Sequence, residues 1–557
     1  MSIQVATERI TSEELIKRLQ QQLEEEHEKC ELQREAIVQL KAQLDEAVNL
    51  IALFKEEIQH LKDEIAVLKG QKPQPKIPPS ILEGPKSGGQ EEGGKAKIPR
   101  GKHPRRKKKV SLKIHQEQIV QPQSIPEGAT FKGYKSYDVQ DLICKSDNTR
   151  FLIARWKLPD GTYICGKLPK GIHGHYGAEL IAYILNDYYA CRVTEPLLLE
   201  KLHQQGILIS EGQLNNILIH RKESFHEEKD ELQLAGIKAH NQIQTDDCGA
   251  RHKGKNQYTN VIGNEWFTVF NTTDSKSRVN FFRLLQGGKH EYVINEDTIA
   301  YLKSINAPGY LPGYISLSKG DNFSSLEAWQ AFLEKRNITK QVEIRLVTEA
   351  ALSASIIENG IPRDLGVHGD DAGQFDAFIR SLCWIHEERH YRKIIPVDEQ
   401  ARVALDQVRN EIWKFYRDLK SYQQAPNDVA KKALEKQFDA LFLSLETSSA
   451  TLNKRLRMTY KKKQELLRVL ERPDTPLHNN SSETDARSAV TKRKVSGGTR
   501  SNKGRDARDT FLSLKQTCRK LGVNFILFLK DRLYGIFDIP RLADMILQQS
   551  EAAKALF

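Results

Sequence analysis

The sequence predicts an α/β protein, in which a mixed sheet is interrupted by a helical insertion. Three short runs with β-like alternation follow one another from about residue 241 to residue 275. A fourth run, DLGVHGDD, comes after a helical pattern at 347–360, and residues 397–470 are helical in pattern almost throughout. A long segment with a seven-residue repeat and a small β/α region precede this core.

Composition limits the kinds of partner that the chain takes. Its 557 residues provide room for roughly three or four domains. The net charge of +12 and the pI near 9.1 favour a polyanionic partner, most simply nucleic acid, although charge alone does not separate DNA, RNA and an anionic membrane surface. The seven cysteines include no C-x-x-C pair, and no run of 18 apolar residues or apolar leader occurs. We therefore expect a soluble cytoplasmic protein without a disulfide framework.

Residues 1–70 carry the pattern of a coiled coil. Thr11 and Glu14 form a capping box, and apolar residues then alternate at spacings of three and four along about five heptads. These residues are Ile37, Leu40, Leu44, Ala47, Ile51, Phe54, Ile58, Leu61, Ile65 and Leu68. The charges at 57, 62, 64 and 69 favour a parallel homodimer; the alternative is a single amphipathic helix that folds back onto its own core.

A Pro/Gly-rich and basic linker, 71–124, follows. Its run RGKHPRRKKK at 100–109 suits a solvated tether, with attraction to nucleic acid as a secondary effect.

The next region, 125–235, contains a predicted β-hairpin around Pro159-Asp160-Gly161 and three short helical segments at 176–185, 194–202 and 210–218. Ser210 is a suitable N-cap for the last of them. The helices form either a DNA-binding helix-turn-helix or an ordinary three-helix unit. Cys144 and Cys165, with His173 and His175, fit no standard zinc spacing, so we expect a metal-free hairpin.

The catalytic core is predicted in two parts, 236–396 and 473–540, separated by the helical insertion 397–472 and followed by a tail, 541–557. We expect helices at 277–285, 347–360 and 377–393, and a further insertion up to about 345. Three strands, a helix, a strand and further helices match the order of a ribonuclease-H-like core.

Three spaced carboxylates stand at the places where such a core holds its acids. Asp246 falls on the first strand, Asp370 at the end of the fourth, and Glu483 on a late helix. Such a set can hold two divalent metal ions for attack on phosphate. Asp246 and Asp370 each begin an Asp-Asp doublet, so the second member of either is an alternative, and Glu483 alone would fit a helix acid paired with Arg487.

A basic track follows Glu483, around Gly497-Gly498. Guanidinium groups bind phosphate in a bidentate manner, and glycine lets the backbone approach a phosphate closely, so we predict DNA binding. The alternative is a flexible exposed loop. The predicted DNA-binding residues are Arg487, Lys492, Arg493, Lys494, Arg500, Lys503, Arg505 and Arg508.

One competing motif is His386-Glu387-x-x-His390, which matches the zincin pattern but lacks an evident third ligand. We regard a metalloprotease as a minor alternative.

The segments QTDDCGARH, TTDSKSR, DDAGQFD, CWIHEERHYRK and LHNNSSETDAR…KRKVSGGTRS…RDTFLSLKQTCRKLG resemble those of DDE transposases of the insertion-sequence-66 type. The resemblance covers roughly 235–395 and 473–535. It implies a ribonuclease-H-like core, two Mg²⁺ or Mn²⁺ ions and metal ligands at Asp246, Asp370 and Glu483. It also implies a C-x-x-H motif, Cys383 and His386, that supports the site.

The resemblance further implies cleavage and strand transfer at the ends of an insertion sequence. The partners would be the terminal inverted repeats, target DNA and accessory proteins of the same element, in a bacterial cytoplasm at the nucleoid and with no membrane. A nuclease that lacks strand transfer, or an inactive coiled-coil DNA-binding protein, are the alternatives.

Overall fold

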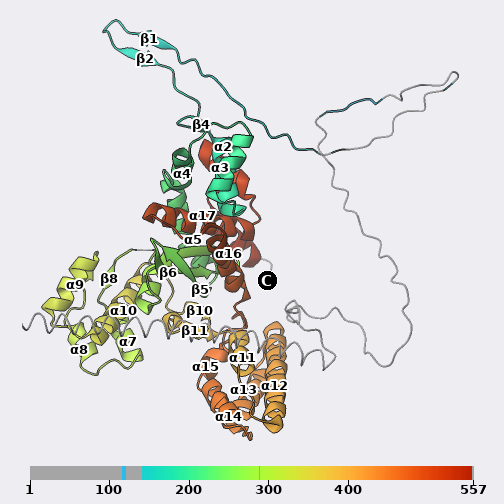
Figure 1. The fold of residues 1–557 in the computed structure, drawn as a ribbon. Coiled ribbons are helices and arrows are strands. Elements are labelled where there is room, and N and C mark those ends of the chain that lie inside the picture. The colour runs from blue at the N-terminus through green and yellow to red at the C-terminus, as the bar shows by residue number, and fades with distance from the viewer. Residues whose placement is uncertain (1–115, 121–128, 130–138, 140, 288, 555–557) are drawn as a thin grey trace, which may run out of the picture. The chain divides into compact units, whose positions relative to one another are not determined.

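The computed structural model describes residues 116–120, 129, 139, 141–287 and 289–554 (Figure 1). The chain divides into two compact units, Met1–Asp138 and Val139–Phe557, and every helix and strand given below belongs to the second. The predicted coiled coil at 1–70 and the basic run at 100–109 lie outside the described residues. No helix in the described ranges has the length and apolar content that a membrane crossing requires.

A five-stranded mixed sheet forms the centre of the second unit, with the order β11-β10-β5-β6-β7. β5, β6 and β7 form an antiparallel meander, while β10 runs parallel to β5, and β11 runs parallel to β10. The strands are β5 (Gln242–His252), β6 (Lys255–Gly263), β7 (Thr268–Thr273), β10 (Gly366–Gly369) and β11 (Ile379–Leu382). The three-strand meander and the fourth strand are therefore confirmed.

The predicted helix at 377–393 is wrong in its first part. Residues Ile379–Leu382 form the strand β11, and the helix α11 begins only at Trp384 and ends at Arg392. A four-residue strand that leads into a helix is too short to show a period of its own, so the sequence pattern did not separate the two elements.

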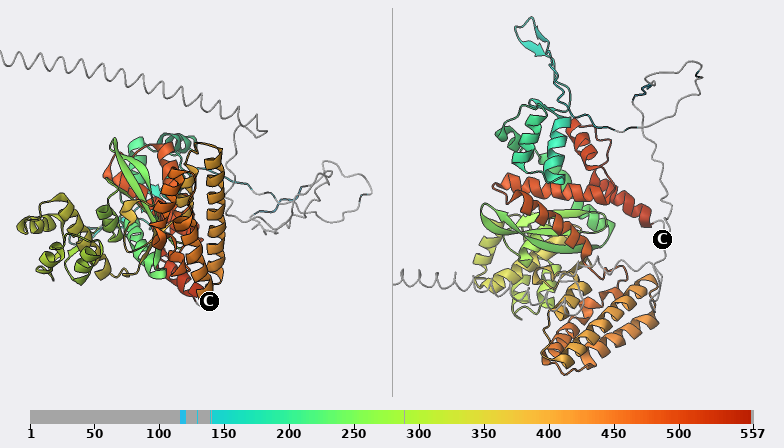
Figure 2. Two further views of the ribbon diagram at one scale, coloured as in Figure 1. Left: turned by 90° about the horizontal axis from the view of Figure 1, so that it is seen from below. Right: turned by 45° about the vertical axis from the view of Figure 1, so that its right-hand side comes forward.

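Helices α16 (Asn480–Ser496) and α17 (Asn502–Lys520) cover one face of the sheet (Figures 1 and 2). Val261 of β6 and Phe270 of β7 are fully buried in a cluster with Ala486, Ala489 and Leu512 of these helices. The opposite face, which includes Ile243 and Ile262, belongs to the larger hydrophobic core. Two helices late in the sequence therefore cover one face of a sheet whose first strand begins at Gln242.

The segment between β7 and β10 is a mixed insertion, as predicted. It contains α6 (Arg278–Leu285), β8 (Tyr292–Val293), α7 (Glu296–Ser304), α8 (Leu311–Ser316), β9 (Asn322–Phe323), α9 (Leu326–Lys335) and α10 (Gln341–Glu358). The hydroxyl of Ser277 accepts a hydrogen bond from the N–H of Asn280 and so caps α6. α10 begins six residues before the predicted helix at 347–360.

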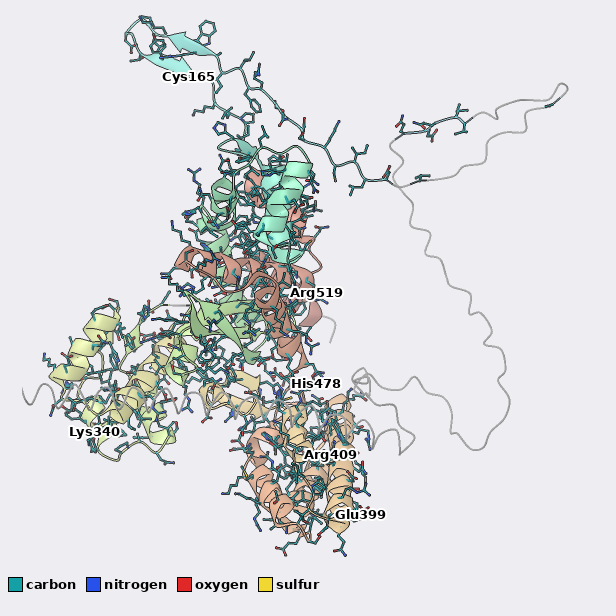
Figure 3. The ribbon with its side chains drawn as sticks, viewed as in Figure 1. Cys165, Lys340, Glu399, Arg409, His478 and Arg519 are labelled. Carbon is teal, nitrogen blue, oxygen red and sulfur yellow. The ribbon has the colours of Figure 1, made fainter. Side chains whose placement is uncertain are left out.

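A helical bundle separates α11 from α16 in the sequence. In Figure 3 the labels Glu399 and Arg409 mark this bundle, and His478 lies where the bundle meets the sheet. The bundle consists of α12 (Glu399–Gln424), α13 (Asp428–Asp439), η3 (Ala440–Ser444), α14 (Ala450–Tyr460), α15 (Lys463–Leu466) and η4 (Arg468–Leu470). Phe415, Phe438 and Phe442 are buried, and Trp384 of α11 packs among them. This packing fixes α11 to the bundle.

The region before the sheet holds the predicted hairpin and helices. Its elements are β1 (Arg155–Lys157), β2 (Tyr163–Cys165), β3 (Ile172–His173), β4 (Tyr176–Gly177), α2 (Ala178–Leu185), η1 (Asn186–Ala190), α3 (Glu195–Gln204), α4 (Glu211–Ile219) and α5 (Glu223–Ala239). Ser210 and Gln213 form the capping box of α4, which packs against α2, α3 and α17. The chain ends with α18 (Phe525–Tyr534) and α19 (Leu542–Lys554), and α19 packs against α5.

Candidate active site

Asp246 lies in the middle of β5, directly opposite Val261 of β6, on the face of the sheet that α16 covers. Its carboxylate accepts a hydrogen bond from the backbone N–H of Asp247 at 2.8 Å. Burial, with added repulsion from Asp370, Asp247 and Glu483, raises the pKa of Asp246 to about 7. Carboxylates from three separate elements therefore lie close enough to act on one another.

Asp370 follows β10 at the end of the strand. One carboxylate oxygen accepts a hydrogen bond from the N–H of Ala372 at 3.0 Å, which turns the chain sharply after the strand. Two arginines hold this loop from outside: Arg278 donates to the carbonyl oxygen of Gly373 at 3.0 Å, and Arg380 donates to the carbonyl oxygen of Asp370 at 3.4 Å.

Glu483 lies in the first turn of α16 and faces α11. Its carboxylate is 3.4 Å from the guanidinium of Arg389 and 3.5 Å from Nε2 of His386. Burial and the neighbouring Arg389 lower the pKa of His386. Within the described residues Glu483 forms no ion pair with Arg487, and its buried Oε1 accepts no hydrogen bond. The simple alternative, a helix acid paired one turn along, does not describe this residue.

Asn479 connects the elements that carry the acids. Its side-chain amide donates to the carbonyl oxygen of Thr245, the residue before Asp246, at 2.8 Å. Its own carbonyl oxygen accepts the N–H of Glu483 at 3.0 Å. In the sequence Asn479 stands out only as a neighbour of Glu483, because its partner lies 234 positions away.

The predicted supporting pair, Cys383 and His386, lies between α11 and α16. The sulfur of Cys383 accepts the N–H of Asn479 at 3.2 Å, while His386 contacts Glu483. Burial raises the pKa of the Cys383 thiol to about 11, so this sulfur is neutral at physiological pH. Its position suits packing of the two helices rather than chemistry.

The second members of the two doublets are engaged elsewhere. Asp247 forms an ion pair with Lys276 and accepts a hydrogen bond from Gln374 at 2.6 Å. Asp371 pairs with Arg380 and Lys462. Across the part of the chain that the structure describes, neither Asp246 nor Asp370 forms an ion pair. The first member of each doublet is therefore the one whose charge is not already matched.

The donor set suits a hard divalent cation, because carboxylate oxygens are the ligands that Mg²⁺ and Mn²⁺ prefer. The buried, unpartnered Oε1 of Glu483 and the mutual repulsion at Asp246 are what a cation would relieve. As placed here, however, no group of three or more His, Cys, Asp or Glu side chains in the described ranges is close enough to hold one ion together. The three residues are of the right chemical type for a divalent cation and lie near one another. Their carboxylates would have to move closer together to coordinate one ion.

The zincin-like motif is structural. Glu387 is buried and forms ion pairs with Arg455 and Lys462, and it accepts a hydrogen bond from Thr459. A general base of a protease must face an open cleft, whereas this glutamate anchors α11 to α14.

The basic track is helical rather than a flexible loop. It runs along the second half of α16, through a short connection, and into α17. Arg487, Lys494, Arg500 and Lys503 are exposed, and the side chains of Arg493, Arg505 and Arg508 are half-buried. These seven cations remain candidates for phosphate contact.

Lys492 must be removed from the predicted DNA-binding set. It is fully buried. Its ammonium donates to the carbonyl oxygen of Tyr188 at 2.6 Å and lies 3.4 Å from the centre of the Tyr188 ring. Burial, with repulsion from Arg508 and Arg192, lowers the pKa of Lys492 to about 7. The partner lies 304 positions away, so the sequence offered no sign of this contact.

The connection between α16 and α17 is fixed to the tip of the β5–β6 hairpin. Thr499 and His252 form a β-bridge, and their side chains share a hydrogen bond of 2.8 Å. A Cβ at Gly498 would lie 2.6 Å from the carbonyl oxygen of Arg251, so this glycine permits close approach of two backbones. The sequence pattern predicts that this glycine lets the backbone approach a phosphate, whereas here it lets two segments of the protein backbone approach each other.

Comparisons with known proteins identify the family of this chain. Residues 372–507 match the family described as Transposase IS66 family, a range that starts just after Asp370 and includes the helical bundle and Glu483. Over 301 residues the chain is 42% identical to the uncharacterized protein y4jO of Sinorhizobium fredii (strain NBRC 101917 / NGR234). That alignment covers 54% of this chain and 94% of the relative. The chain belongs to the transposase IS66 family.

Proposed function

We propose that this protein is a DNA transposase that cleaves the ends of an insertion sequence and joins them to target DNA in a metal-dependent reaction. The observation that carries the proposal is the grouping of Asp246, Asp370 and Glu483. These acids come from β5, the end of β10 and α16, and the first two carry no ion pair within the described residues.

The sheet supports a ribonuclease-H-like core. An antiparallel meander of three strands, followed after helices by a fourth strand parallel to the first, agrees with the predicted order of elements, whereas the fifth strand, β11, was not predicted. The acids fall in the middle of the first strand, after the fourth and on a late helix, where such a core places them.

We assign Asp246, Asp370 and Glu483 as ligands of two Mg²⁺ or Mn²⁺ ions. When bound, these ions supply activation of water or a 3′-hydroxyl and stabilisation of the leaving oxygen. The protein's part is to position the three carboxylates. Asn479 fixes the spacing between β5 and α16, and Arg389 holds the carboxylate of Glu483 from the side of α11.

DNA is the proposed polyanionic partner, both as terminal inverted repeats and as target. The exposed and half-buried cations of α16 and α17 support this, because they begin one helical turn after Glu483. The three-helix unit at α2–α4 is a further candidate for DNA contact as a helix-turn-helix, although the exposed residues Glu211, Gln213 and Asn216 of its third helix, α4, include no cation.

We further propose a parallel homodimer through the heptads of residues 12–69, accessory proteins from the same element, and action at the bacterial nucleoid in the cytoplasm. The heptad pattern supports the first of these, and the family supports the others.

A cleavage assay on the element's own end DNA, with and without Mg²⁺, tests the proposal. Cation-dependent nicking at the end, followed by joining to a second duplex, is the expected result. Nicking without joining would favour a nuclease, and binding without nicking would favour an inactive DNA-binding protein.

A further inference from the structure

A groove opens beside the β5–β6 hairpin, a few residues beyond Asp246. β10 pairs with β5 only along Gln242–Gln244, so the outer edge of β5 is free of β10 after that point. The groove has a volume of about 390 Å³, within the range of about 300–1,000 Å³ that ligand sites span. Gly249, Arg251, Asn256, Gln257, Tyr258 and Arg493 line it.

The charge of the groove is positive. Arg251 comes from β5 and Arg493 from α16, and none of the lining residues is acidic. Lys253 and Lys255 are exposed on the hairpin turn next to it. The ammonium of Lys276 lies 5.1 Å from the centre of the Tyr258 ring and forms an ion pair with Asp247. An anionic ligand in the groove would therefore meet the guanidinium groups of Arg251 and Arg493.

The shape of the groove depends on a glycine opposite an aromatic ring. Gly249 is the cross-strand partner of Tyr258, so no side chain from β5 stands beside the ring at that position. A Cβ at Gly249 would lie 2.9 Å from a terminal nitrogen of Arg493, which reaches the edge of β5 here. Gln257 contributes a buried side-chain oxygen that has no hydrogen-bond partner among the described residues.

Cations that follow a backbone, an aromatic ring for stacking and an unsatisfied amide are the features of a site for single-stranded nucleic acid. We propose that this groove binds an unpaired stretch of DNA, with a base stacked on Tyr258 and phosphates on Arg251 and Arg493. This rests on the proposed function, because it takes DNA as the ligand.

Gly249 and Tyr258 are three positions along from the pair Asp246 and Val261, so they belong to the opposite face of the sheet from the carboxylate of Asp246. The groove is therefore a surface separate from the carboxylates.

The test uses the full chain in EDTA, so that no DNA is cut. The probe is a duplex with a short single-stranded gap that contains one 2-aminopurine, whose fluorescence falls when it stacks. Wild type should quench the probe and bind it more tightly than an uninterrupted duplex of the same length. Tyr258→Ala should lose the quenching and weaken binding to the gapped DNA by roughly 5- to 150-fold, whereas Tyr258→Phe should keep both.

Tyr310→Ala, which removes an exposed tyrosine of the insertion, is the matched control and should behave as wild type. Arg251→Ala tests the groove independently of the ring, and it should reduce the salt dependence on gapped DNA by about 0.7 unit of log–log slope. Equal affinity of wild type and Tyr258→Ala for gapped DNA, with unchanged quenching, would overturn the proposal. Since the readout is binding alone, that result would count against the groove whether or not the protein cleaves DNA.

Discussion

The side-chain amide of Asn479 donates to the carbonyl oxygen of Thr245 at 2.8 Å, and this single bond connects the start of α16 to the strand that carries Asp246. Asn479 is fully buried, and its backbone N–H is also used, by the sulfur of Cys383. The hydrogen bond to Thr245 therefore directly links the segments that carry the first and third acids, in addition to the packing of Ala486 and Ala489 against the sheet.

Asn479→Ala should leave the Thr245 carbonyl oxygen unsatisfied and lower the free energy of unfolding by about 1–3 kcal/mol. It should also reduce cleavage by more than it reduces DNA binding, because the acids lose their fixed spacing. Urea unfolding and a cleavage assay measure the two effects. Asn480→Ala, at the next position, is the control; full activity and stability of Asn479→Ala would show that the bond does not position the acids.

His240 provides a pH-dependent contribution to stability. It lies 3.2 Å from Asp474 and 3.3 Å from Glu265, and these partners raise its pKa to about 9. A histidine in an unfolded chain titrates near 6.5, so the stabilisation is complete below about pH 6.5 and is lost as the pH rises through about 9. Both carboxylates are about half exposed, so we expect about 1 kcal/mol.

Denaturant unfolding of wild type and His240→Gln at pH 6, 8 and 9.5 checks this contribution. The stability difference between the two proteins should shrink as the pH rises. A difference that stays constant across the series would mean that the imidazolium does not contribute.

The exposed and half-buried cations of the basic track should contact phosphate without reading sequence. Arg500→Ala combined with Arg505→Ala should weaken binding to specific and random duplexes in parallel, and lower the salt dependence by about one unit of log–log slope per charge. Lys492→Met should leave the salt slope unchanged, because this lysine is buried. Loss of affinity for the element's own ends alone would mean that the arginines contact bases.

The predicted coiled coil can be tested as part of the full chain. Ile51→Lys with Ile58→Lys would place charge in the apolar seam, and should convert a dimer into a monomer in sedimentation equilibrium. A wild-type chain that sediments as a monomer at micromolar concentration would exclude the dimer.

Much of the sheet was predictable, because its antiparallel strands are bounded by turn residues and show a period of two. The strand Ile379–Leu382 was not, since it has too few residues to reveal a period before a helix begins. The choice within each Asp-Asp doublet depends on Lys276, Gln374, Arg380 and Lys462, whose approach only the fold determines. The burial of Lys492 likewise depends on a tyrosine from a distant helix.

The doublets allow the central claim to be tested directly. Mg²⁺-dependent cleavage of the element's own end DNA should be measured for Asp246→Asn, Asp370→Asn and Glu483→Gln beside the neighbours Asp247→Asn and Asp371→Asn. The first three changes remove ligand charge with little change of shape, so cleavage should fall to background while DNA binding persists. The two neighbours should retain measurable cleavage, because their carboxylates are held by ion pairs. Cleavage at the wild-type rate by any of the first three variants would remove that residue from the site and contradict the proposed mechanism.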